Sequence, residues 1–283
     1  MKKIIAIYHK NCIDGTVAAA VVLRKFPQAQ LFPLSHDYKP SDLEEILSVI
    51  DKETEVYTVD CGIGVSEILN RGFKVTTLDH HIGAKETLDL LAKENSDFTF
   101  IFDNNKSGAS LTWQYFFPTE ELPEMIKLVE DSDLWKGRYG EDTKKVNSYL
   151  WLFTNNPAQV LQILSGDLEE IKSKGAIISA YAGKEIAEQV EISPINLKIG
   201  EDMLPAYNIT THESACGNIL SSRNGCAAVM FTIKGNDVKL SFRSVDGQRP
   251  SALDLAKQFD GGGHVLAAGA RVSLEDFIKM IVV

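Results

Sequence analysis

The chain has 283 residues, of which 44% are hydrophobic and 24% are charged, and this is typical of a globular protein large enough for two domains. The formal net charge of −10 argues against a protein that tracks along long DNA or RNA, which requires a broad basic surface. A short nucleotide remains compatible with this charge, whereas no apolar run approaches the length of a membrane span.

The first hundred residues alternate between apolar runs and helical patterns. The opening apolar stretch is too short for a signal peptide and ends at His9 and Lys10, so we expect a buried strand there. The alternation predicts an α/β fold with a parallel sheet covered by helices on both faces. The expected strands are residues 3–8, 29–33, 55–59, 73–78 and 97–102, and the expected helices are residues 15–25 and 65–71.

From Ser107 to residue 191 the pattern is mostly helical, and residues 166–191 are expected to form a long connecting helix. Short apolar strands return after Ser193-Pro194, which predicts a smaller α+β domain. We therefore expect an N-terminal domain over residues 1–191 and a C-terminal domain over residues 192–283. Its expected strands are residues 195–199, 206–209, 227–233 and 238–242, with helices over 212–221 and 251–259.

The cysteines Cys12, Cys61, Cys216 and Cys226 are widely spaced and form no C-x-x-C pair. This spacing favours free thiols in a reducing cytoplasm over a disulfide framework or a structural zinc site. Cys12 and Cys61 are expected to serve only as small packing side chains.

Histidine and aspartate follow several of the expected strands, where the carboxyl ends of parallel strands meet at one edge of the sheet. Carboxylates and imidazoles without matching cations indicate metal ligands, and a set without thiolates suits Mn²⁺ or Mg²⁺ better than structural zinc. Alone, each group could be a helix cap or a turn, but their recurrence favours a shared site. The segments concerned are residues 9–15, 60–62, 79–81 and 103–108, and residues 131–133 follow an expected helix over 122–130.

A second signal lies in the C-terminal domain, where three consecutive glycines precede His264. A glycine run lets the backbone approach a ligand closely and direct N–H groups at an anion. Arg243, at the end of an expected strand, offers a planar group suited to a phosphate. A glycine run alone would indicate only a turn, whereas the combination favours an anion site.

These motifs, in this order, resemble those of the DHH phosphoesterase superfamily, in the branch with a DHH-associated C-terminal domain. The resemblance covers nearly the whole chain, and its relatives include RecJ-like exonucleases, nanoRNases and dinucleotide phosphodiesterases. It rests on residues 9–19, Asp60-Cys61-Gly62, Leu78-Asp79-His80-His81, residues 107–110 with Asp131, residues 241–244 and residues 261–264.

The resemblance implies a site for two Mn²⁺ ions, with Mg²⁺ or Co²⁺ as alternatives. It also implies that Asp60 bridges the ions, that Asp79 orients an adjacent imidazole, and that His81 lies beside the scissile phosphate. The implied metal ligands are His9, Asp14, Asp60, His80 and Asp131, and the implied substrate-binding residues are Arg243, Gly262, Gly263 and His264.

One departure from the family pattern concerns the first motif, which commonly has aspartates four and six positions after the histidine. Ile13 stands at the first of these places, and the one aspartate that remains, Asp14, lies five positions after His9. One ion is therefore expected to be held more weakly, with water or Asn11 completing its shell. Asp133 is the alternative ligand to Asp131.

The expected reaction is hydrolysis of a short oligonucleotide or a linear dinucleotide such as pGpG to mononucleotides, from a terminus, by a metal-bound hydroxide. Alternatives are a phosphatase of small monoesters such as 3′-phosphoadenosine phosphate, or a nucleotide-binding module impaired by the change at Ile13. No long duplex nucleic acid and no membrane is expected as a partner, and a homodimer remains open. Trp135 is a candidate to stack on a base, although packing is the more common role of tryptophan.

Overall fold

A computed structural model of the chain describes residues 2–35 and 38–282. The chain divides into two compact units between Ser179 and Ala180, inside helix α9 (Leu168–Gln189). This helix coincides closely with the expected connecting helix, whereas the domain boundary at residue 192 remains a prediction. No described helix is long and apolar enough to cross a membrane.

The N-terminal unit is built around a sheet in which, within the described part of the chain, the strand order is β2-β1-β3-β4-β5. All neighbouring strands pair in parallel, so their carboxyl ends lie at one edge. This confirms the α/β fold class. The strands are β1 (Lys3–His9), β2 (Gln30–Leu34), β3 (Thr54–Val59), β4 (Val75–Asp79) and β5 (Phe98–Phe102).

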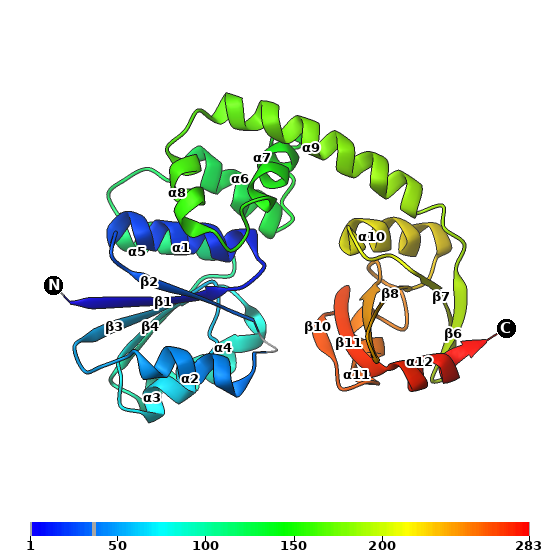
Figure 1. Cartoon of the computed structure of the whole chain (residues 1–283), viewed down its shortest axis with the longest axis horizontal. Coiled ribbons are helices and arrows are strands. Elements are labelled where there is room, and N and C mark those ends of the chain that lie inside the picture. Colours follow the sequence, from blue (N-terminus) through cyan, green and yellow to red (C-terminus); the bar gives the residue numbers. More distant parts are fainter. Residues whose placement is uncertain (1, 36–37, 283) are drawn as a thin grey trace. The chain divides into compact units, whose positions relative to one another are not determined.

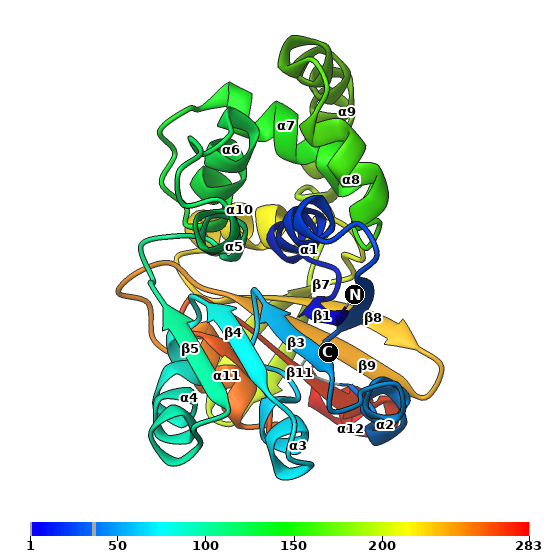
Figure 2. The same cartoon turned by 90° about the vertical axis from the view of Figure 1, so that its left-hand side faces the viewer.

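Helices cover both faces of this sheet (Figures 1 and 2). Alternate residues of β1 face opposite layers, so that Ile5 and Ile7 join one apolar cluster while Ala6 and Tyr8 join the other. One face is covered by α2 (Pro40–Ser48), α3 (Val65–Asn70) and α4 (Ile82–Glu94). The other face is covered by α1 (Ile13–Lys25) and α5 (Gly108–Phe116). Behind α1 and α5 lie α6 (Glu124–Asp133), α7 (Glu141–Trp151) and α8 (Pro157–Leu164).

Helix α1 positions the site because it is buried along most of its length, between the sheet and the helices α5 and α8. The small side chains of Ala18, Ala19 and Ala20 are fully buried and allow this close packing on several sides. The amino end of α1, with Asp14 in its first turn, is thereby fixed at the carboxyl edge of the sheet.

The C-terminal unit contains a mixed sheet with the order β10-β11-β9-β8-β7-β6-β12 among the described residues. Helix α10 (Glu213–Asn224) packs on one face, and α11 (Ala252–Lys257) and α12 (Leu274–Met280) pack on the other. This α+β arrangement confirms the predicted class of the second domain. Its strands are β6 (Ile195–Ile199), β7 (Asp202–Tyr207), β8 (Ala228–Lys234), β9 (Asp237–Arg243), β10 (Gly262–His264), β11 (Ala267–Ser273) and β12 (Ile281–Val282).

Several elements of this unit were not predicted from the sequence. Strands β10 and β11 are rich in glycine and alanine, which have low strand propensity, and they exist because they extend the sheet beyond β9. Strand β7 begins four residues earlier than the expected strand over 206–209. The glycine run is therefore an edge strand rather than an open turn.

Candidate metal centre

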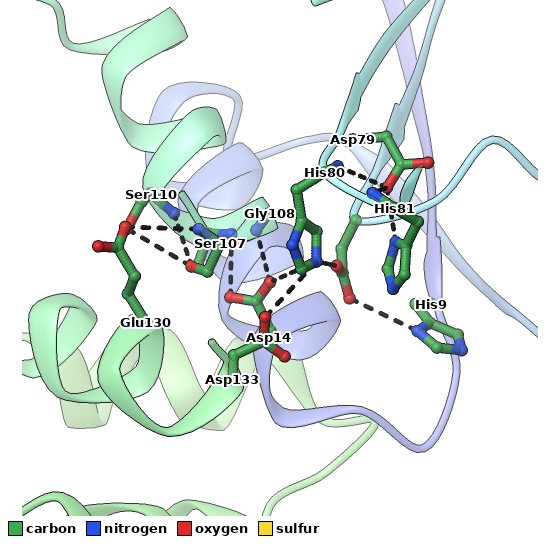
Figure 3. A network of polar contacts seen from close by, with 12 residues as sticks. His9, Asp14, Asp79, His80, His81, Ser107, Gly108, Ser110, Glu130 and Asp133 are labelled. Atoms are coloured by element: carbon green, nitrogen blue, oxygen red, sulfur yellow. Dashed lines mark hydrogen bonds and ion pairs between the residues drawn. The ribbon is translucent and has the colours of Figure 1, made fainter. Parts of the chain in front are cut away.

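The carboxyl ends of β1, β3 and β4 bring His9, Asp60 and His80 together. Figure 3 shows His9 and His80 in this cluster. Asp60 Oδ1 lies 3.1 Å from His80 Nε2, and Asp60 Oδ2 lies 3.6 Å from His9 Nδ1. Burial alone would raise the pKa of Asp60, but its contacts with His80 and His9 hold this pKa below its ordinary value. Asp60 is thus an ionised carboxylate with each oxygen directed at a different imidazole.

Asp14 reaches the same place from the first turn of α1. Its carboxylate accepts hydrogen bonds from the backbone N–H groups of Gly108 (2.5 Å) and Ala109 (3.1 Å), at the positive end of α5. Asp14 Oδ2 also lies 3.9 Å from His80 Nε2. Burial and the neighbouring charge of Asp60 nevertheless raise the pKa of Asp14 well above its usual range, which a nearby cation would reverse.

Two glycines permit this close assembly around Asp60. A Cβ atom at Gly108 would lie 2.5 Å from Asp60 Cβ, and one at Gly15 would lie 2.5 Å from the carbonyl oxygen of His9. Both distances are far below van der Waals contact, so any larger residue at either position would displace the carboxylate or the strand end.

Only one of the two candidate aspartates of α6 faces this cluster. Asp133 Oδ2 lies 3.5 Å from His80 Nε2. Asp131, the ligand implied by the family resemblance, instead accepts hydrogen bonds from Arg138 N (2.8 Å) and Thr143 Oγ1 (2.6 Å). Residues two apart on a helix point about 200° away from each other, so both carboxylates cannot face one site. Of the two, Asp133 therefore faces the cluster and Asp131 does not.

The pKa of Asp133 reflects its surroundings. Burial and the charge of Asp60 raise it to about 6. Two buried carboxylates at such close quarters repel each other unless a cation lies between them. Carboxylates crowded in this way are the electrostatic pattern expected of residues that bind a metal ion.

Asp79, at the end of β4, fixes the orientation of His81. Its Oδ1 atom lies 2.7 Å from His81 Nδ1 and accepts hydrogen bonds from the backbone N–H groups of His80 and His81. Burial would lower the pKa of His81, but the contact with Asp79 raises it to about 9. The imidazole oriented by Asp79 is thus that of His81, and its Nε2 atom remains directed away from Asp79.

The donor atoms present fit divalent ions. Asp60, Asp79, His80 and His81 place ligand atoms within 4.8 Å of one another, as do the groups His9, Cys12, Asp60 and Asp14, His80, Asp133. Among the described residues, the buried atoms Asp60 Oδ2 and Asp133 Oδ2 accept no hydrogen bond. Each of these oxygens faces an imidazole nitrogen only at ion-pair distance, 3.6 Å for His9 and 3.5 Å for His80. A bound cation would satisfy such buried anionic oxygens more fully. Cys12 was not expected in this cluster. Its position in the sequence between His9 and Asp14 is the signal that could have indicated it.

Two of the predicted anion-binding residues of the C-terminal unit, Arg243 and His264, lie in one row of its sheet. Ala267 of β11 pairs with His264 of β10 on one side and with Arg243 of β9 on the other. Side chains in one row of a sheet point to the same face, so the small Ala267 separates the two polar ones. Arg243 also donates a hydrogen bond to Ser214 Oγ (2.7 Å) on α10.

The glycines beside His264 have different roles. A Cβ atom at Gly263, whose φ is +138°, would lie 2.6 Å from the carbonyl oxygen of Ala267, whereas nothing lies within 4 Å of one at Gly262. Gly263 is therefore required by the packing of β10 on β11. Gly262 faces open space, and the binding role predicted for both glycines remains a prediction.

Comparisons with known proteins were made by sequence and by structure. No family model matches the chain. The bifunctional oligoribonuclease and PAP phosphatase NrnA of Bacillus subtilis (strain 168) is 22% identical over 267 residues, covering 89% of this chain and 82% of NrnA. The uncharacterized protein R106 of Acanthamoeba polyphaga mimivirus is 27% identical over 143 residues, which span 46% of this chain but only 33% of the viral protein.

Solved structures share the fold over nearly the whole chain. The pGpG-specific phosphodiesterase PggH from Vibrio has a TM-score of 0.53 at 15% identity, covering 98% of this chain and 96% of PggH. RecJ from Thermus thermophilus, solved with Mn²⁺, has a TM-score of 0.56 at 15% identity, covering 99% of this chain and 51% of RecJ. The chain therefore shares its fold with these proteins, and its ordered motifs resemble those of the DHH phosphoesterase superfamily, in the branch with a DHH-associated C-terminal domain.

Proposed function

We propose that this protein is a divalent-metal-dependent phosphodiesterase that hydrolyses short oligonucleotides or linear dinucleotides to mononucleotides. The observation that carries the proposal is the position of Asp60, whose two oxygens face His80 and His9 separately. A carboxylate with this geometry is suited to bridge two metal ions, the arrangement used for phosphoryl chemistry. Mn²⁺ is the preferred ion, and Mg²⁺ and Co²⁺ are alternatives.

His9, Asp14, Asp60, His80 and Asp133 would hold the metal ions. When bound, two such ions supply an activated water and neutralise charge that develops on the phosphate. His81 Nδ1 is engaged by Asp79, so His81 Nε2 is the ring atom available to a phosphate oxygen of the substrate. Asp79 is accordingly proposed to orient His81, and His81 to assist the reaction.

The second unit is proposed to bind the phosphate or terminal nucleotide of the substrate through Arg243, Gly262, Gly263 and His264, so that cleavage proceeds from a terminus. The net charge of −10 supports a substrate of a few nucleotides rather than a long duplex. PggH, which shares the fold, is named as a pGpG-specific phosphodiesterase, and this supports pGpG as the first substrate to test. The free cysteines support a reducing cytoplasm as the location.

The test is release of mononucleotides from pGpG and from RNA of two to five nucleotides, with Mn²⁺ present or removed by a chelator. We expect Mn²⁺-dependent turnover that Asp60→Asn abolishes. If Mn²⁺-loaded protein turns over none of these substrates, the proposal is wrong. Hydrolysis that survives Asp60→Asn would not come from this centre.

A phosphatase of small monoesters is a second candidate, because NrnA is named as both an oligoribonuclease and a PAP phosphatase. The same metal chemistry serves both reactions, so the site does not distinguish them. Hydrolysis rates measured side by side on pApA and 3′-phosphoadenosine phosphate would distinguish the two reactions. Tight nucleotide binding without turnover on either would instead favour a binding module.

A further inference from the structure

The loop between β1 and α1 brings a thiol into the metal centre. Cys12 Sγ, a nitrogen of His9 and an oxygen of Asp60 lie within 4.8 Å of one another. Ligands of one ion lie about 3–4 Å apart, so small side-chain movements would bring this group around a cation. Ile13 follows Cys12 directly and offers no ligand atom.

Asn11, the other neighbour that was expected to complete the shell, is occupied elsewhere. Its side-chain oxygen accepts a hydrogen bond from Asn155 Nδ2 (2.7 Å), and its backbone N–H donates one to Asn155 Oδ1 (2.8 Å). The reciprocal pair holds Asn11 in a left-handed conformation, with φ of +57°. Because Asn11 is committed to Asn155, Cys12 is the remaining candidate ligand in this loop.

The position of Cys12 is held by its backbone. Its carbonyl oxygen accepts a hydrogen bond from Thr16 Oγ1 (2.7 Å), and Thr16 Oγ1 in turn accepts one from Asn155 N (3.1 Å). The thiol is therefore presented by a fixed loop. A ligand whose backbone is already held in place binds a metal with less loss of conformational entropy.

A second observation independently points to a cation at this place. Asp60 Oδ2 belongs to a side chain that is only 1% exposed, and within the described residues it has His9 Nδ1 at an ion-pair distance of 3.6 Å but no closer hydrogen bond. Cys61 provides a contrast, because it is 1% exposed and packs in the apolar cluster on one face of the sheet. Of these two neighbouring thiols, only Cys12 joins the polar group.

We propose, resting on the proposed function, that Cys12 is a thiolate ligand of the ion held by His9 and Asp60. The sulfur–metal bond forms as the thiol proton passes to solvent. A thiolate at this position favours softer ions, so the centre should prefer Co²⁺ or Cd²⁺ over Mg²⁺ more strongly than an all-oxygen-and-nitrogen site would. Cys12 thereby supplies a ligand in place of the carboxylate that the family pattern has at the position of Ile13, and it determines which metal the site prefers.

The test is titration of metal-free protein with Co²⁺ in a phosphine reductant, which does not supply competing thiols. Wild type and Cys61→Ser should show the near-ultraviolet sulfur-to-cobalt charge-transfer band, and Cys12→Ser should lack it. Calorimetry should show that Cys12→Ser weakens Co²⁺ binding by at least about tenfold, the smallest loss typical when metal-site partners are removed. Cys12→Asp should bind Mg²⁺ more tightly than wild type does.

A variant that retains only Cys12, with serine at positions 61, 216 and 226, keeps the test decisive if Cys12→Ser does not fold. This variant should retain the band. Cobalt binding without a sulfur band in wild type would overturn the proposal while leaving the phosphodiesterase intact. A band that depends on Cys12 in a protein that hydrolyses no nucleotide would uphold the ligand and refute the proposed function instead.

Discussion

The assignment of Asp133 rather than Asp131 to the metal centre predicts opposite effects of two conservative substitutions on the same helix. Asp131 accepts hydrogen bonds from Arg138 N, Tyr139 N and Thr143 Oγ1 and is only 2% exposed. Asp131→Asn removes the charge and directs an amide N–H₂ at donors. Since a hydrogen bond to a charged group contributes about 1.5–3 kcal/mol, we expect a loss of about 2–3 kcal/mol in the free energy of unfolding.

Asp133→Asn should act on metal binding instead. Removing a carboxylate from beside Asp60 relieves repulsion, so the metal-free protein should be at least as stable as wild type. In wild type, Mn²⁺ at 100 times its dissociation constant should stabilise the folded state by about 2.7 kcal/mol. Each tenfold loss of affinity in Asp133→Asn should remove about 1.4 kcal/mol of this gain.

The assay is thermal unfolding of both variants with and without Mn²⁺, since each kcal/mol moves the melting temperature of a unit of this size by about 2–4 °C. Asp131→Asn should melt about 4–12 °C lower but keep the shift caused by Mn²⁺. Asp133→Asn should keep its melting temperature without metal and lose most of the shift. The opposite pattern, with the shift lost only in Asp131→Asn, would refute the placement of α6 in the site.

Three further substitutions test the packing around the centre and the two proposed substrate contacts. Gly108→Ala should displace Asp60, lower kcat by at least about tenfold and weaken Mn²⁺ binding. The control is Gly183→Ala in α9, where a Cβ atom would meet nothing within 4 Å, and it should leave kcat and Mn²⁺ binding unchanged. Equal activity of the two variants would contradict the packing argument. Arg243→Ala should raise KM for a dinucleotide by about 10- to 150-fold, the equivalent of one charged hydrogen bond, and calorimetry should find Mn²⁺ affinity unchanged. Trp135, which is 78% exposed and therefore not a core residue, should contribute base stacking, so that Trp135→Ala raises KM by about 5- to 150-fold; a change below about twofold would exclude it.

The convergence of ligands at one sheet edge could be predicted from the sequence because it follows from topology alone. Once β1, β3 and β4 are recognised as parallel strands, the residues after them must meet. His9, Asp60 and His80 therefore required no knowledge of side-chain conformation. The same reasoning predicted the α/β class, since parallel strands require crossover connections, which are usually helices.

The choice between Asp131 and Asp133 could not be predicted, because it depends on where α6 ends. The helix was expected to stop at residue 130, which would have left both aspartates in a loop. In the structure α6 continues to Asp133, and helical rotation then directs the two carboxylates to different sides. A shift of three residues in a helix terminus is ordinary, yet it decides which side chain can reach the ion.

The first-motif loop was likewise not predictable in detail, because residues far along the chain determine its shape. Asp14 is held by Gly108 and Ala109 of α5, and Asn11 is held by Asn155, which follows α7. The sheet brings the strand ends to one edge, but these helical segments determine which atoms of the loop face the metal ions. A change in the helical part of the N-terminal unit should therefore alter metal binding without touching a ligand, and the loop sequence alone cannot reveal that the Cys12 thiol faces His9 and Asp60.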